Sequence, residues 1–163
     1  MFIKLLLEGL GLSLILFIIC AVGIKSGAVG MVQLYHKDVQ DRCVELGLTT
    51  HEKIKKRAIA VRLISIPTYL VYVLLCVYLI NQSRGFVTGF LHIFAILSVM
   101  NLFDRFVIDE FWVGHTNAWT IPGTEDLKPY INGKDKVMKW LMGIVGMAAF
   151  ATIIAAIMSL ILK

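Results

Sequence analysis

Four long apolar segments constrain this chain more than any other feature of its sequence. They cover about residues 2–24, 59–80, 86–107 and 137–162. A helix rises about 1.5 Å per residue, so about 20 apolar residues cross the roughly 30 Å hydrocarbon layer of a bilayer. Inside that layer the backbone polar groups must bond to each other, and a helix achieves this within one segment. We therefore predict an all-α integral membrane protein with four transmembrane helices in a single domain, residues 1–163.

The composition agrees with this class. Hydrophobic residues make up 58% of the chain and charged residues 17%, and the mean hydropathy is +0.81. These values are typical of polytopic membrane proteins and leave no room for a large aqueous domain.

A cleaved signal peptide is the alternative for the first segment, but Lys4 is followed by Glu8 and no A-x-A site follows, so we expect a retained helix. Cys20, Cys43 and Cys76 form no C-x-x-C pair, so we expect reduced, structural thiols.

The positive charges are unevenly distributed and predict an orientation. Thirteen of the sixteen Lys and Arg residues lie on two long loops, about 25–58 and 108–136, or on the helix ends beside them. Because loops rich in Lys and Arg stay in the cytoplasm, we expect both long loops there and both termini outside a cell membrane. In a membrane protein the net charge of +5 more often reflects orientation and anionic lipid than nucleic acid, so we expect no nucleic-acid partner.

The first long loop has the pattern of a short amphipathic helix on the cytoplasmic face. Its apolar residues recur at helical spacing: Val32, Tyr35, Val39, Cys43 and Leu46. Such a helix is expected at or just below the membrane surface, with Gly47 ending it. Thr49 and Glu52 then form a T-x-x-E capping box, which predicts the start of the next helix.

The candidate site lies where the third segment leaves the bilayer, between Phe103 and Asn132. Polar, charged and aromatic side chains gather there and just before it. The candidate ligand-binding residues are Asn101, Asp104, Arg105, Asp109, Glu110, Trp112, His115, Asn117 and Trp119. An ionisable cluster at a membrane edge suggests a functional site by default. A structural ion-pair network is the alternative.

Charge pairing within this cluster can be predicted in part. Arg105 and Asp109 are four residues apart, so they pair on one helix face. The negative end of the helix dipole lies nearby, so Asp104 and Glu110 need a loop lysine, a bound cation or a cationic headgroup. Asn101 lies one turn before Arg105 and is expected to face the bundle. We expect these residues and His115 to form a polar cup, with the first loop as its lid.

The aromatic and histidine residues of the stretch allow two interpretations each. Trp112 and Trp119 fit the aromatic belt of a membrane interface, or one of them walls a cavity. His115, beside Thr116 and Asn117, belongs to a small hydrogen-bonding cluster or to a solvated loop.

Neither a metal nor a cofactor is predicted. First-loop acids and histidines could approach the candidate site across the cytoplasmic face: His36, Asp38, Asp41, His51 and Glu52. Such mixtures occur in any charged loop, so we predict no metal site. The sequence contains no phosphate-binding glycine loop, nucleophile elbow or dinucleotide fingerprint, and the cofactor remains unassigned. His92 is the only histidine within a span, so a bis-histidine haem has no second ligand and we expect a buried, hydrogen-bonded side chain.

Turn signals follow at Pro122–Gly123 and Asn132–Gly133, with Thr124 as a cap for a short helix between them. The run D-x-x-x-x-D from Asp104 to Asp109, followed by I-P-G-T-E at 121–125, resembles uncharacterised small four-span bacterial membrane proteins. The resemblance implies the architecture and carries no activity.

Three functions are compatible with these patterns. The first is binding of a lipid or another amphipathic small molecule, with its headgroup in the polar cup. The second is an enzyme, a transferase or hydrolase, acting on such a molecule, with His115 or an acid as general base and Arg105 holding an anionic group. The third is an accessory subunit whose last helix contacts a partner helix or a second copy through Ala151, Ala155 and Ser159.

Overall fold

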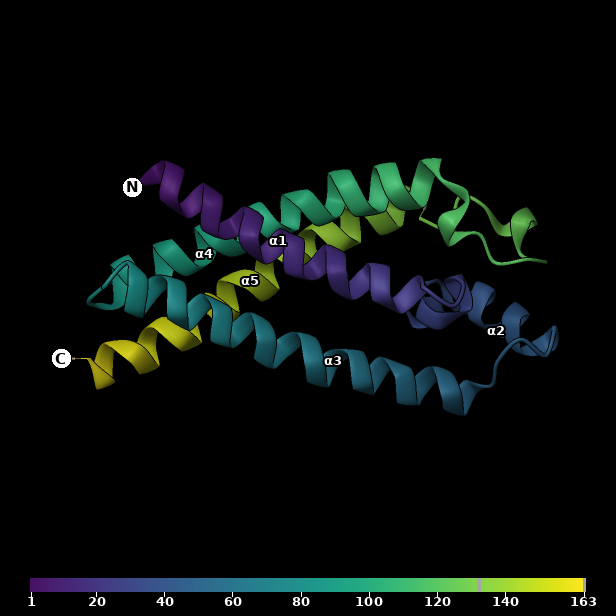
Figure 1. Ribbon diagram of the computed structural model, residues 1–163, viewed down its shortest axis with the longest axis horizontal. Helices are drawn as coiled ribbons and strands as arrows, with labels where there is room; N and C mark the ends of the chain where they lie inside the picture. Colours follow the sequence, from purple (N-terminus) through teal and green to yellow (C-terminus); the bar gives the residue numbers. More distant parts are fainter. Residues whose placement is uncertain (132, 163) are drawn as a thin grey trace.

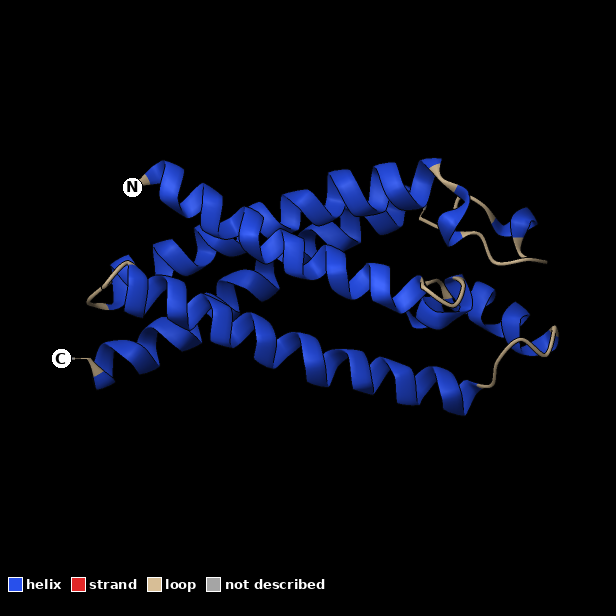
Figure 2. Ribbon diagram, viewed as in Figure 1, coloured by secondary structure: helices blue, strands red, loops and turns tan. Residues whose placement is uncertain are grey.

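The computed structural model describes residues 1–131 and 133–162, with the side chains of 133–135 left aside. This part of the chain contains helices and turns and no strand (Figure 2). The long helices are α1 (Phe2–Ile24), α3 (His51–Leu74) continued by η2 (Leu75–Ile80), α4 (Phe86–Phe103) continued by η3 (Asp104–Val113), and α5 (Gly133–Ile161). The predicted all-helical class is confirmed, and four helices are long and apolar enough to cross a membrane. Both chain ends lie at one end of the bundle, the termini end, and the two long connections lie at the opposite loop end (Figure 1).

Helix α4 is the centre of the bundle, because both α1 and α5 pack against it. Gly9 allows the close approach of α1, since a Cβ atom there would lie 2.4 Å from Val99 Cβ. On α5, Ala151 and Ala155 are fully buried in the apolar cluster that the helices share. Two residues of the predicted partner-binding row are therefore covered by the chain's own helices.

The predicted single helix of the first loop is wrong, because the segment forms two helices. These are η1 (Ala28–Leu34) and α2 (Lys37–Glu45), separated by extended backbone at Tyr35. Val32, Val39 and Cys43 are buried in the protein core at the loop end. Four of the five residues of the predicted apolar stripe therefore pack inside the molecule, and Leu46 is 48% exposed. A protein core selects the same apolar spacing as a membrane surface.

The boundaries of α2 and α3 follow local capping chemistry. Gly47 ends α2 as predicted, with φ +71° and the Leu48 amide donating to the Cys43 carbonyl at 3.0 Å. The predicted cap at Thr49 is wrong by one residue: Thr49 is buried, and the exposed Thr50 accepts the hydrogen bond from the Lys53 amide. Helix α3 therefore begins at His51.

After η3 the chain forms two short turns of helix, η4 (Asn117–Trp119) and η5 (Glu125–Leu127). The predicted turn at Pro122–Gly123 is present, with Gly123 at φ +84°. Thr124 precedes η5 as predicted, but its hydroxyl donates to the Ile121 carbonyl at 2.9 Å and makes no capping bond. Asn132, which belongs to the second predicted turn, lies outside the described residues.

The cysteines and His92 have the predicted environments. Cys20, Cys43 and Cys76 are free and buried. His92 is buried in α4, with Nδ1 2.7 Å from the hydroxyl of Ser83.

Candidate functional site

A cavity of about 310 Å³ lies at the loop end, between α1, η3 and the start of α5. Its apolar and sulfur-bearing walls come from Leu16, Cys20, Leu34, Ile108, Val113 and Ile131. Aromatic side chains of Tyr35, Trp119 and Tyr130 complete the apolar part. The remaining wall, here called the ionic wall, consists of Asp104, Arg105, Asp109 and Lys139.

The π-helical geometry of η3 explains why several of its side chains reach one cavity. In a π-helix the amide of one residue bonds to the carbonyl five residues earlier, so residues five apart lie nearly above one another. Asp104 and Asp109 are five apart, as are Ile108 and Val113, and all four line the cavity. In an α-helix such pairs would point about 140° apart.

The ionic wall is a connected network of four charged groups. Arg105 Nη1 lies 2.5 Å from Asp109 Oδ2, and its Nη2 lies 3.4 Å from Asp104 Oδ2. Lys139 Nζ lies 3.2 Å from the same Asp109 oxygen. The predicted pairing of Arg105 with Asp109 is confirmed, and the side chains of both are only 15% exposed. The second cation is Lys139 of α5. From the sequence it is only one of the thirteen charges that predict the orientation, because nothing in the residues around it indicates a contact with η3.

Two N–H groups of the cavity-lining residues have no hydrogen-bond partner among the described residues. These are Arg105 Nε and Trp119 Nε1, and both atoms are buried. Each can only donate. An unpaired buried donor costs about 1–3 kcal/mol. These residues therefore retain unused capacity to donate to an oxygen atom.

The two long connections pack on each other and cover the cavity; residues 28–45 and 117–131 are here called the cap. The hydroxyl of Tyr35 donates to the Trp119 carbonyl at 2.5 Å, and its ring packs edge-on against Tyr130 with centroids 5.1 Å apart. Burial raises the pKa of Tyr35, which keeps this hydroxyl protonated as a donor. The first loop is thus joined directly to the cavity wall.

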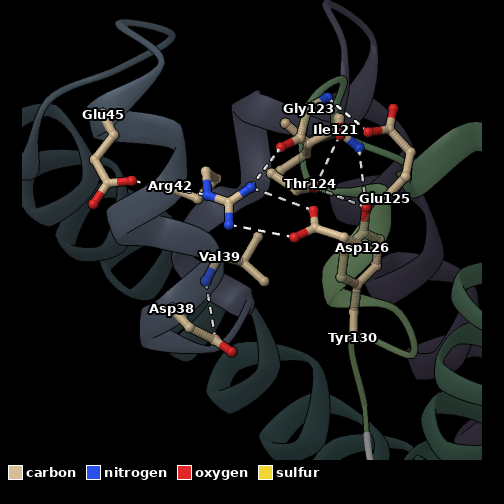
Figure 3. A network of polar contacts seen from close by, with 10 residues as sticks. All are labelled: Asp38, Val39, Arg42, Glu45, Ile121, Gly123, Thr124, Glu125, Asp126 and Tyr130. Atoms are coloured by element: carbon tan, nitrogen blue, oxygen red, sulfur yellow. Dashed lines mark hydrogen bonds and ion pairs between the residues drawn. The ribbon is translucent and has the colours of Figure 1, made fainter.

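A polar network holds the outer part of the cap (Figure 3). Both terminal nitrogens of Arg42 lie 3.3 Å from the Asp126 carboxylate, and one donates to the Gly123 carbonyl at 3.4 Å. Thr124 and Tyr130 share a hydroxyl contact of 2.9 Å beneath them. Sequence reasoning missed Tyr35 and Tyr130 as site residues, because contacts between two loops leave no periodic signal.

Glu110 and His115 lie in a smaller recess beside the cavity. This recess, of about 160 Å³, shares Asp109, Val113, Tyr130 and Ile131 with the cavity. Glu110 pairs with Lys136 at 2.5 Å, so a lysine near the start of α5 neutralises its charge. His115 is exposed, and its Nδ1 lies 2.8 Å from the Glu110 carbonyl oxygen.

Three further predicted site residues line neither the cavity nor this smaller recess. Asn101 is buried against α5, with its Oδ1 3.0 Å from where a Cβ of Gly143 would lie. Trp112 packs edge-on against Trp119, and Asn117 is exposed at the start of η4. The cavity therefore brings together Asp104, Arg105, Asp109 and Trp119. Glu110 and His115 lie in the adjoining recess, and Trp112 contacts the site through Trp119.

An outer recess connects the cavity with the protein surface. It measures about 350 Å³ and shares five lining residues with the cavity: Leu34, Tyr35, Tyr130, Ile131 and Lys139. Its other walls include Lys37 and the exposed Met138. A molecule could therefore reach the ionic wall past Leu34 and Met138.

Among the described residues, no group of three or more His, Cys, Asp or Glu side chains gathers in a way that could hold a metal. Asp41 and His51 of the first loop do approach each other, with 3.9 Å between Oδ1 and Nε2.

In comparisons with family models, curated proteins and solved structures, nothing matches this chain.

Proposed function

We propose that this chain is a multi-pass membrane protein that binds a lipid or another amphipathic small molecule in the cavity at the loop end. One observation carries the proposal: the same cavity combines a half-buried ionic wall with apolar and aromatic walls. Binding sites for small molecules are mostly apolar, with a few polar groups that fix orientation. An amphiphile needs both surfaces, because its tail packs on apolar side chains and its headgroup requires charged partners.

The depth of the ionic wall along the helix supports a lipid-like ligand. From Phe86 to Arg105 the helix rises about 30 Å, which is the thickness of a hydrocarbon layer. In a bilayer, Arg105 would then lie where acyl chains meet headgroups. A headgroup could reach the ionic wall while its tail stays in the apolar layer.

The charge distribution supports an orientation for the proposed protein in a cell membrane. Thirteen of the sixteen Lys and Arg residues belong to the loop end by sequence. By the positive-inside rule, the cap and the cavity would face the cytoplasm and both termini would lie outside. The ligand would then come from the cytoplasmic leaflet or from the cytoplasm.

Mass spectrometry of the gently purified protein tests ligand binding. Leu34 lies at the mouth of the cavity and is 52% exposed, so Leu34→Trp should block entry without disturbing the core. We expect the parent protein to retain a stoichiometric amphiphile and Leu34→Trp to lose it. Leu63→Trp is the matched control, since Leu63 is an exposed leucine of α3 away from the cavity, and it should retain the ligand. Equal retention by both variants would contradict binding in this cavity.

A further inference from the structure

We propose that the headgroup bound in this cavity carries a cationic amine together with an anionic phosphodiester, as the headgroup of phosphatidylethanolamine does. The inference rests on the proposed function and names the class of ligand. It follows from the charge balance of the ionic wall and from the unused hydrogen-bonding capacity on each side of its central ion pair.

The ionic wall is balanced before any ligand arrives. It contains two carboxylates, Asp104 and Asp109, and two cations, Arg105 and Lys139. A ligand of net charge would leave one uncompensated charge in a mostly buried site, which is unfavourable. A headgroup that is neutral overall avoids this.

The ionic wall has unused hydrogen-bonding capacity on both an acceptor and a donor. Asp104 has one ion-pair contact among the described residues, the 3.4 Å contact with Arg105, although a carboxylate can accept about four hydrogen bonds. On the donor side, Lys139 contacts only Asp109 among the described residues, although an ammonium carries three donors. Arg105 Nε is unpaired too, but this atom is enclosed by the protein and does not face the open cavity. One acceptor group, Asp104, and one donor group, Lys139, are therefore available beside the Arg105–Asp109 pair.

A zwitterionic headgroup satisfies both sides at once. Its amine can donate to Asp104, and its phosphate oxygens can accept from Lys139. Sugar or glycerol hydroxyls could hydrogen-bond to the same groups but bring no charge of their own, so they would lack the Coulomb attraction that an amine and a phosphate gain there. A purely anionic headgroup would face Asp104 without an amine to answer it.

Competition among lipids in detergent micelles tests the class of ligand. The probes are a phosphatidylethanolamine, a phosphatidylglycerol and a diacylglycerol with the same acyl chains, and the readout is the bound fraction of each by mass spectrometry. We expect phosphatidylethanolamine to be bound in preference to the other two. Asp104→Asn, which removes the carboxylate but keeps its shape, should reduce this preference on the order of tenfold relative to phosphatidylglycerol. Glu52→Gln makes the same change in charge on an exposed glutamate of α3 and should leave the preference unchanged.

Two further arms make the result decisive. Lys139→Gln should weaken the binding of both phospholipids, because both present a phosphate, and this arm stands even if Asp104→Asn fails to fold. Soluble glycerophosphoethanolamine, a phosphodiester that is neutral overall, should raise the melting temperature of the parent protein if the natural ligand is a free headgroup-sized compound, and should not if the ligand is a lipid. Binding of phosphatidylglycerol or diacylglycerol as strongly as phosphatidylethanolamine would overturn the zwitterionic class and leave the proposed function standing. If the parent protein bound none of the three lipids, both the zwitterionic class and the proposed function would be overturned.

Discussion

Arg105 holds two carboxylates of η3 that would otherwise repel each other across the cavity wall. Its planar guanidinium directs one terminal nitrogen to Asp109 and the other to Asp104. A lysine supplies one compact charge and cannot bridge both groups with the same geometry. Lys139 shares Asp109 from the opposite helix, so the ionic wall also joins η3 to α5.

Replacing Arg105 should therefore affect stability as well as binding. Arg105→Ala leaves the two carboxylates with Lys139 as their only cation in the ionic wall, and breaking such a buried pair costs about 3–5 kcal/mol. Arg105→Lys should retain part of this stability and still lose ligand. Thermal unfolding in detergent measures the first effect, with the exposed Arg62→Ala as a matched control that should change little. A double-mutant cycle with Asp109→Asn that shows no coupling would reduce Arg105 to an ordinary interfacial arginine.

At the scale of elements, the continuation of the third helix was predictable and its geometry was not. The helical pattern runs through residues 103–113, and the structure has a helix there. Whether backbone amides bond four or five residues back depends on packing, so α-helical periodicity could pair Arg105 with Asp109 but could not place Asp104 beside Asp109. Because η3 is π-helical, the side chains of Asp104 and Asp109 both line the cavity.

The cap shows a second limit of sequence reasoning. The stripe from Val32 to Cys43 fits a membrane surface and a protein core equally well, because both select apolar residues at helical spacing. Contacts between distant loops, such as that of Tyr35 with Trp119, place these residues in the protein core. Such contacts depend on the tertiary fold and leave no local pattern.

The packing of α1 on α4 gives a prediction with an internal control. Gly9→Ala should lower the free energy of unfolding by about 1–3 kcal/mol, because the new methyl group meets the stiff, β-branched Val99. Gly146 of α5 has no atom within 4 Å of the same position. Gly146→Ala should therefore be neutral, or stabilising by up to about 1 kcal/mol. Equal melting temperatures of the two variants in detergent would mean that α1 does not pack on α4 through Gly9.

At the scale of the whole molecule, apolar segments of bilayer length made the four-helix architecture readable from the sequence alone. The orientation in a membrane remains a prediction, and the native thiols cannot report it because all three are buried. Exposed positions at the two ends are better reporters: Ser26 at the loop end and Arg84 at the termini end. In intact cells a membrane-impermeant thiol reagent should label Arg84→Cys directly and Ser26→Cys only after permeabilisation. The opposite pattern would place the cavity outside the cell.

The cavity at the loop end is proposed to hold the headgroup of an amphiphile. Photo-cross-linking with a phospholipid that carries its reactive group beside the headgroup, followed by peptide mapping, tests this proposal. We expect adducts on cavity residues of three separate elements: Cys20 in α1, Ile108 or Val113 in η3, and Tyr130 in the cap. Leu34→Trp should remove these adducts and leave those on outward-facing side chains unchanged. Adducts confined to exposed faces, such as Leu63 of α3 or Leu160 of α5, would rule out headgroup binding in this cavity.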